Sequence, residues 1–164
     1  MPSGKTHAAM TVAAAAGLCI TGYALGAPTV PTWAVTGGCL AGVLLTPDLD
    51  VDNPVHSHAI VDRRMGCLPG FIWRIFWYPY ARVIPHRHWL SHAPVVGSLL
   101  RLAYMGIPLY IVLVLLGYAR IDSYFPPWWL WVPIGLVISD SLHWAADMGF
   151  SQTRRFFRRL FRRH

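Results

Sequence analysis

Residues 107–118 read IPLYIVLVLLGY, and this run without a charged side chain is typical of a helix inside a membrane. The apolar stretch around it covers about residues 94–118, more than the ~20 residues that a helix needs to cross a bilayer. Three further apolar stretches cover about residues 8–27, 32–47 and 127–146. The sequence therefore predicts an all-α fold, an integral membrane four-helix bundle that forms a single domain.

The composition agrees with a membrane protein. Of the 164 residues, 55% are hydrophobic and 13% charged, against about 45–50% and about 25% in soluble domains. The charged residues are thirteen Arg, one Lys and seven Asp, with no Glu, so the formal net charge is +7. In so hydrophobic a chain, a basic excess indicates contact with an anionic membrane surface rather than with nucleic acid.

The first apolar stretch has a second interpretation. Lys5, the apolar run and the small residues at 24–27 also fit a signal peptide with a cleavage site. Two features favour a membrane span instead: only one Lys precedes the apolar run, and the connection to the next apolar stretch is only a few residues long.

The arginines predict the orientation. Residues 48–93 carry five arginines and residues 152–164 carry six, whereas the connections at 28–31 and 119–125 contribute only Arg120. Basic segments remain on the cytoplasmic side of a membrane. We therefore expect both termini and a long cytoplasmic loop, residues 48–93, on the inner side of a cytoplasmic or thylakoid-type membrane.

Two segments on that side are rich in both aromatic and basic residues. Residues 68–84 fit either a helix lying in the membrane interface or a re-entrant segment packed on the bundle. Residues 152–164 fit a basic C-terminal helix that binds anionic lipid headgroups or docks a partner membrane subunit.

Histidine and aspartate gather at the same side from four separate parts of the chain. Imidazole and carboxylate without thiolate suit Zn, Mn or non-haem Fe, and positions 140, 143 and 147 share one helical stripe. A network of buried ion pairs is the structural alternative, while His56, His58 and His164 are expected to face solvent. The gathered residues are His7, Asp48, Asp50, Asp52, His86, His88, His92, Asp140, His143 and Asp147.

The order of these motifs resembles a known family. The motifs are MPSGKTH at residues 1–7, PDLD at 47–50, HRHWLSH at 86–92 and DSLHWAAD at 140–147. Together they resemble a family of small, uncharacterised membrane metal-binding proteins common in cyanobacteria. More distantly they are similar to LexA-regulated, membrane-bound, metal-dependent hydrolases, a group related to the zinc-dependent phospholipase C and P1 nuclease superfamily.

The resemblance implies a metal centre and a reaction class. It carries the ligand role to His7, Asp48, Asp50, His86, His92, Asp140, His143 and Asp147. The leading function is metal-dependent hydrolysis of a phosphoester at the cytoplasmic membrane face, with Zn as the first choice of ion. Asp50 or Asp140 would act as general base, and Arg87 would clamp a phosphate oxygen. A non-catalytic metal-binding or scaffold subunit of a membrane complex is the alternative. A transporter is disfavoured because Arg101 is the one charge in the middle of a predicted span.

Overall fold

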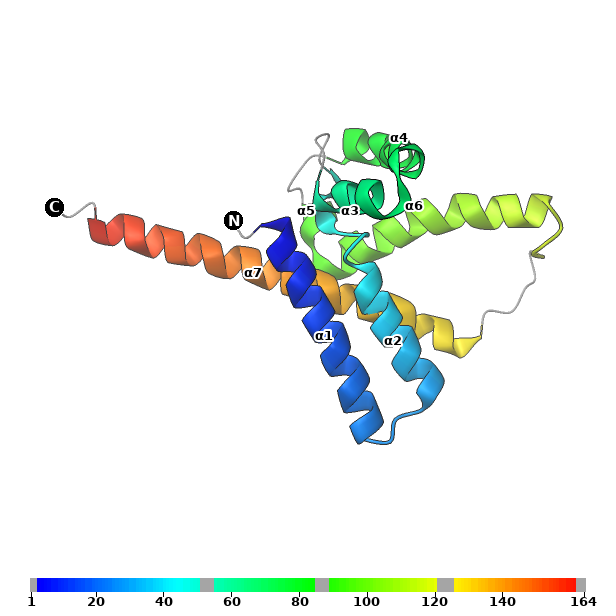
Figure 1. Ribbon diagram of the computed structural model, residues 1–164, viewed down its shortest axis with the longest axis horizontal. Helices are drawn as coiled ribbons and strands as arrows, with labels where there is room; N and C mark the ends of the chain where they lie inside the picture. The colour runs from blue at the N-terminus through cyan, green and yellow to red at the C-terminus, as the bar shows by residue number, and fades with distance from the viewer. Residues whose placement is uncertain (1–2, 51–54, 85–88, 121–125, 162–164) are drawn as a thin grey trace.

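The computed structural model describes residues 3–50, 55–84, 89–120 and 126–161, and the regular secondary structure in them is all helical (Figure 1). The all-α prediction is thus confirmed. The chain begins with a hairpin of α1 (Gly4–Ala24) and α2 (Thr29–Ala41). Gly26 allows the turn between them, since its φ of 67° lies in the left-handed region that favours glycine.

Helix α2 packs tightly on α7 (Trp131–Phe161). A Cβ added to Gly38 would lie 2.0 Å from the Val132 carbonyl oxygen, and one added to Gly135 would lie 2.0 Å from the Val35 oxygen. The two backbones can touch only because both positions are glycine.

The predicted stretch 32–47 is shorter as a helix than the sequence suggests. Helix α2 has 13 residues and ends at Ala41, so it spans about 20 Å and cannot cross a hydrocarbon core of about 30 Å. Residues Pro47–Asp50 form the separate short helix η1.

The predicted cytoplasmic loop contains two helices, α3 (His56–Met65) and α4 (Cys67–Val83). Trp77 and Tyr80 of α4 are 1% and 3% exposed, so one face of this helix packs on the rest of the protein. The opposite face is apolar and exposed along the helical stripe Leu68, Phe71, Ile72 and Ile75. Helix α4 therefore packs on the protein, as expected of a packed re-entrant segment, and also has the exposed apolar face expected of a helix in the membrane interface.

The last part of the chain contains α5 (Trp89–His92), α6 (Pro94–Leu115), η2 (Pro127–Leu130) and α7. Helix α7 is a single helix of 31 residues. The stretch predicted as the fourth span and the basic segment that follows it are therefore one continuous helix as far as Phe161.

Two helices, α1 and α6, are long and apolar enough to cross a membrane. Only 17% and 11% of their most apolar windows are buried inside the protein. Helix α7 is not one of the helices in the described part of the chain that could cross a membrane. Figure 1 shows α6 diverging from the α1–α2 hairpin, and α1, α2 and α6 contact α7 between Val132 and Asp147. The predicted membrane bundle of four spans is not confirmed, because only α1 and α6 among the described helices are long and apolar enough to cross a membrane.

A small apolar core fixes η1 against α4 and α7. Its buried members include Leu49, which is 0% exposed and stands between Asp48 and Asp50. Because Leu49 is held in the core, the two aspartates on either side of it have fixed positions. The core consists of Leu45, Leu49, Trp77, Tyr80, Ile84 and Leu136.

Candidate metal centre

Four elements deliver histidine or aspartate to one place. His7 lies in the first turn of α1, where the Ser3 side chain accepts a hydrogen bond from the Thr6 N–H at 3.3 Å and caps the helix. The Asp48 N–H donates to the Thr46 hydroxyl at 3.4 Å, which shapes the start of η1. His92 ends α5 just before Pro94 begins α6. His143 and Asp147 lie one turn apart on α7.

His7, His143 and Asp147 form the first group of converging donors. His7 Nε2 is 3.3 Å from Asp147 Oδ1, and His143 Nε2 is 3.5 Å from Asp147 Oδ2. The two imidazole rings are stacked with centroids 3.8 Å apart and planes inclined by 16°. The three ligand atoms lie within 4.8 Å of one another, a spacing that suits one bound ion.

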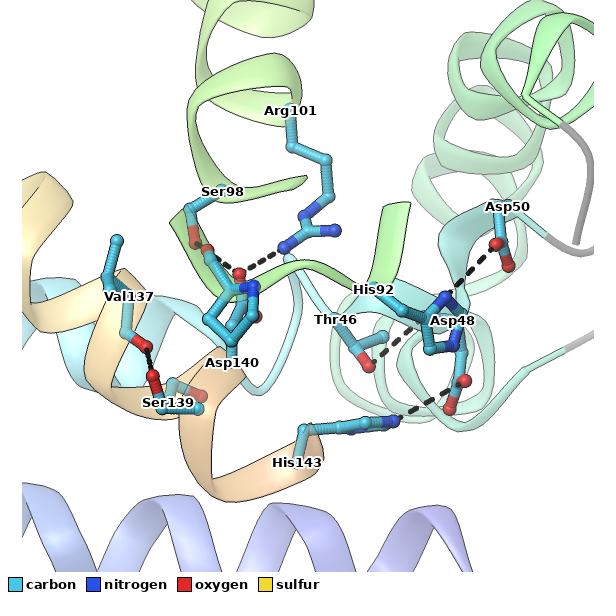
Figure 2. Close-up of polar contacts among 12 residues, drawn as sticks. Thr46, Asp48, Asp50, His92, Ser98, Arg101, Val137, Ser139, Asp140 and His143 are labelled. Atoms are coloured by element: carbon cyan, nitrogen blue, oxygen red, sulfur yellow. Dashed lines mark hydrogen bonds and ion pairs between the residues drawn. The ribbon is translucent and has the colours of Figure 1, made fainter. Parts of the chain in front are cut away.

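Asp48, His92 and His143 form the second group, with ligand atoms also within 4.8 Å of one another. Figure 2 shows His143 pointing toward Asp48 of η1 and His92 close by. His143 Nε2 is 3.6 Å from Asp48 Oδ1, and the His92 and His143 ring centroids are 6.2 Å apart. His143 belongs to both groups, so the two are parts of one cluster.

His143 and Asp147 bring buried polar atoms into this cluster that need a partner. Among the described residues, His143 Nε2 and Asp147 Oδ1 are buried and have no hydrogen-bond partner. Leaving such a group unsatisfied costs about 1–3 kcal/mol, and more when it is charged. A cation between the imidazoles and the carboxylates would satisfy these atoms. The residue types and their geometry therefore fit a divalent metal.

The cluster is closed on one side and open on the other. His7 and His143 are 8% and 6% exposed, whereas the Asp48 side chain is 28% exposed. Solvent or a small ligand can reach the cluster from the side of Asp48.

Asp50 contacts the cluster through His92. Its carboxyl oxygen Oδ2 is 3.6 Å from His92 Nδ1, and Asp50 itself is 2% exposed (Figure 2). A carboxylate at Nδ1 fixes the orientation of an imidazole and leaves Nε2 free to bind a metal. The structure thus places Asp50 beside a candidate ligand, outside both groups of converging donors.

Asp140 lies in a second buried polar cluster. It accepts hydrogen bonds from the Ser98 hydroxyl and the Arg101 guanidinium of α6 (Figure 2). Arg101 and Ser98 are 0% exposed and Asp140 is 2% exposed. The sequence hypothesis of a buried ion-pair network therefore describes this cluster, and Asp140 belongs to neither metal-ligand group. A lone arginine in an apolar helix requires a buried partner, and Asp140 is that partner for Arg101.

Other histidines fall outside the cluster. His86, Arg87 and His88 lie outside the described residues. His58, expected to face solvent, is 6% exposed, and its Nδ1 accepts a hydrogen bond from the Val55 N–H at 3.1 Å. Burial lowers the pKa of His58, the charge of Arg74 lowers it further, and Asp62 opposes the shift. His58 therefore acts as a neutral acceptor at the start of α3.

The fold and the cluster define a class: a helical protein with a buried imidazole–carboxylate site of the metal-binding type. The chain belongs to the family described as uncharacterized metal-binding protein (DUF2227), whose model matches residues 2–157. The expected resemblance to a metal-binding family is thus confirmed over nearly the whole chain. A search of curated proteins and of solved structures finds no match.

Proposed function

We propose that the protein binds one divalent metal ion and uses it to hydrolyse a phosphoester at the cytoplasmic face of a membrane. His143 Nε2 faces both Asp147 and Asp48 at 3.5 and 3.6 Å. One imidazole nitrogen has a single lone pair to donate, so both groups of donors describe one mononuclear centre. The ligands in this proposal are His7, Asp48, His92, His143 and Asp147.

One observation carries the metal assignment: donors from four helical elements converge, and the buried atoms His143 Nε2 and Asp147 Oδ1 lack a hydrogen-bond partner within the described part of the chain. Surface carboxylates often cluster by chance, but burial of unsatisfied nitrogen and oxygen atoms is costly. The donor set favours Zn, with Mn or Fe as alternatives.

The open side near Asp48 supports a catalytic rather than a structural centre, since catalytic sites keep a coordination position for water or substrate. A divalent ion held there supplies Lewis-acid chemistry: it polarises a phosphoryl oxygen and lowers the pKa of a water molecule. Asp50 holds the orientation of His92, and Arg87 clamps a phosphate oxygen from the segment that precedes α5.

The proposal places the protein in the inner membrane. Helices α1 and α6 supply long apolar surfaces that the rest of the chain leaves uncovered, and α4 adds the exposed stripe Leu68, Phe71, Ile72 and Ile75. The arginine bias puts both termini and the metal centre on the cytoplasmic side. The basic segment at 152–164 then contacts anionic headgroups.

A non-catalytic metal-binding or scaffold subunit is the second candidate. The uncovered face of α1, with Ile20 at 69% and Leu25 at 78% exposed, is also suited to contact with a partner membrane subunit.

The test combines metal content with activity. The protein purified in detergent is analysed for bound metal and assayed on bis(p-nitrophenyl) phosphate and on phospholipid vesicles, before and after chelation. His143→Ala and Asp147→Ala should each lower metal affinity about 10–100-fold without preventing membrane insertion. The matched control is Asp62→Asn. The Asp62 carboxylate is 2.6 Å from the Arg74 guanidinium and belongs to neither group of converging donors.

Three results are distinguishable. Metal-dependent hydrolysis supports the whole proposal. Stoichiometric metal with no activity on either substrate selects the non-catalytic subunit. A double variant His143→Ala/Asp147→Ala with full metal content would replace the metal centre with a network of ion pairs.

A further inference from the structure

Three segments that carry candidate metal ligands meet at the Ser139 side chain of α7. Thr11 of α1 forms a hydrogen bond there, with its Oγ1 3.1 Å from Ser139 Oγ. Gly42, which ends α2 six residues before Asp48, packs against the same side chain, since a Cβ added to Gly42 would lie 2.1 Å from Ser139 Oγ. Thr11 and Ser139 are 5% and 3% exposed. Thr11, Gly42 and Ser139 thus form a buried contact that we call the Ser139 junction.

The Ser139 junction is in register with the metal centre along both helices. Thr11 follows His7 by four residues, and Ser139 precedes His143 by four (Figure 2). Residues four apart lie on one face of a helix, about 6 Å from each other along its axis. The stacked rings of His7 and His143, with centroids 3.8 Å apart, and the Thr11–Ser139 hydrogen bond are therefore successive contacts between α1 and α7. A shift of one helix along the other displaces both contacts by the same amount.

The side chains of α1 define its register weakly apart from this hydrogen bond. Residues 8–18 read AAMTVAAAAGL, in which Thr11 is the one polar side chain. Small residues allow helices to approach closely but present no ridges that interlock with a neighbour. A buried hydrogen bond forms in one register only, because any other register leaves its hydroxyls without partners. Cys39 of α2 also contacts α1 at this residue, with its Sγ donating to the Thr11 carbonyl oxygen at 3.7 Å.

Ligand positions at a metal centre tolerate little displacement. Metal–ligand distances are met to within about 0.2 Å. Sliding α1 by one residue would move His7 by about 1.5 Å along the helix axis and turn it by about 100°. His7 Nε2 would then lose its neighbour Asp147 Oδ1, from which it is 3.3 Å away. Helix α1 therefore presents its imidazole to the metal centre in one register only.

We propose that Thr11 and Ser139 are positioning residues of the metal centre: their hydrogen bond selects the register of α1 on α7 that places His7 beside His143 and Asp147. This inference rests on the proposed metal binding and deepens it, and it requires no hydrolysis. Both hydroxyls lie one helical turn from the converging donors, so they act through the helices that carry the ligands.

The experiment compares two buried threonines in the full chain, purified in detergent. Thr11→Val preserves the shape of the side chain and removes the hydroxyl. Thr36→Val on α2 is the matched control, because Thr36 is 6% exposed and its Oγ1 has no hydrogen-bond partner among the described residues. Affinity for Zn²⁺ is measured by competition with a chromogenic chelator, well below the unfolding transition. Thr11→Val should weaken binding about five- to tenfold, the factor that one buried hydrogen bond supplies, and Thr36→Val by less than about twofold.

Rescue and spectroscopy separate positioning from packing. Thr11→Ser restores the hydroxyl and should bring the Zn²⁺ affinity back to within about twofold of the wild type, although the lost methyl group lowers stability. Co²⁺ in place of Zn²⁺ reports the geometry of the donors through its visible absorption bands, which should change in Thr11→Val and return in Thr11→Ser. Ser139→Ala removes the same hydrogen bond from α7, so the double variant Thr11→Val/Ser139→Ala should bind metal no more weakly than either single variant.

The outcomes separate this inference from the proposed function. Equal Zn²⁺ affinity of Thr11→Val and the wild type, equal losses in Thr11→Val and Thr36→Val, or additive losses in the double variant would each overturn the positioning role. Ser139→Ala decides alone if Thr11→Val does not fold. A wild-type protein that binds no metal would overturn the positioning role and the proposed function together. Metal binding that Thr11→Val weakens, without hydrolysis by the wild type, leaves the positioning role standing and removes the hydrolase.

Discussion

Replacing Asp140 with asparagine removes the negative charge that faces Arg101 and preserves the shape of the side chain. Both residues are buried, 2% and 0% exposed, so the variant leaves a buried guanidinium without its counterion. Breaking such a pair from one side costs about 3–5 kcal/mol. For a chain of 164 residues, each kcal/mol lowers Tm by about 2–4 °C, so Asp140→Asn should lower Tm by about 6–20 °C.

Two companion variants test the cause of this loss. Arg101→Met leaves the Asp140 carboxylate unpaired and should destabilise by a similar amount. The double variant Arg101→Met/Asp140→Leu removes both charges and should cost less than either single change. The measurement is thermal unfolding of the detergent-solubilised protein, followed by circular dichroism.

Measuring the bound metal distinguishes whether Asp140 is a metal ligand or only the ion-pair partner of Arg101. Well below the unfolding transition, all three variants should retain the metal of the wild type, because Asp140 contacts Ser98 and Arg101 rather than the converging donors. Loss of the ion from Asp140→Asn but not from Arg101→Met would show that Asp140 is a ligand. A Tm equal to that of the wild type in both single variants would refute the energetic reasoning about the buried pair.

Three further outcomes are expected. Gly38→Ala should lower stability by about 1–3 kcal/mol, measured as Tm, because its Cβ would lie 2.0 Å from the Val132 carbonyl oxygen; Gly37→Ala, with nothing within 4 Å, should not. Deleting residues 152–164 should leave metal content unchanged and weaken binding to anionic vesicles, most clearly at low salt; loss of the metal would show that this segment builds the site. A reporter fused after His164 should be cytoplasmic and one inserted near Ser123 external; finding both on one side would contradict the orientation.

The sequence predicts which side of α7 carries the buried polar residues. It does not predict which neighbouring element each of these residues meets along the helix axis. Positions 140, 143 and 147 share a helical stripe, and His143 and Asp147 do meet the donors from other elements. Asp140 lies seven residues before Asp147, which is about 10 Å along the helix axis. At that height the neighbour is Arg101 of α6. Periodicity predicts which side of a helix is buried, and only the packing of another helix determines what meets it there.

The middle of the chain was the hardest part to predict, for a related reason. Within residues 48–93, the aromatic and basic segment 68–84 indicated an interfacial helix or a packed re-entrant segment, and α4 forms there, whereas no pattern in the sequence predicted α3. Helix α4 is stabilised by the burial of Trp77 and Tyr80 against Leu49, a contact between distant segments. Hydropathy identified α1 and α6 because their apolar composition is a local property.

Because α7 is continuous, the rotation about the helix axis between the metal ligands and the basic segment is fixed. Each residue of an α-helix turns the chain by about 100°, so the number of residues after Asp147 sets the direction in which the basic end faces relative to the ligands. Inserting two residues after Gly149 would rotate everything beyond it by about 200°, with the metal centre intact. Inserting seven, close to two full turns, would restore the original direction about 10 Å farther along the axis. Because the ligands and the basic end belong to one uninterrupted helix, a surface that binds the basic end also fixes the direction in which the metal centre faces around the axis of α7.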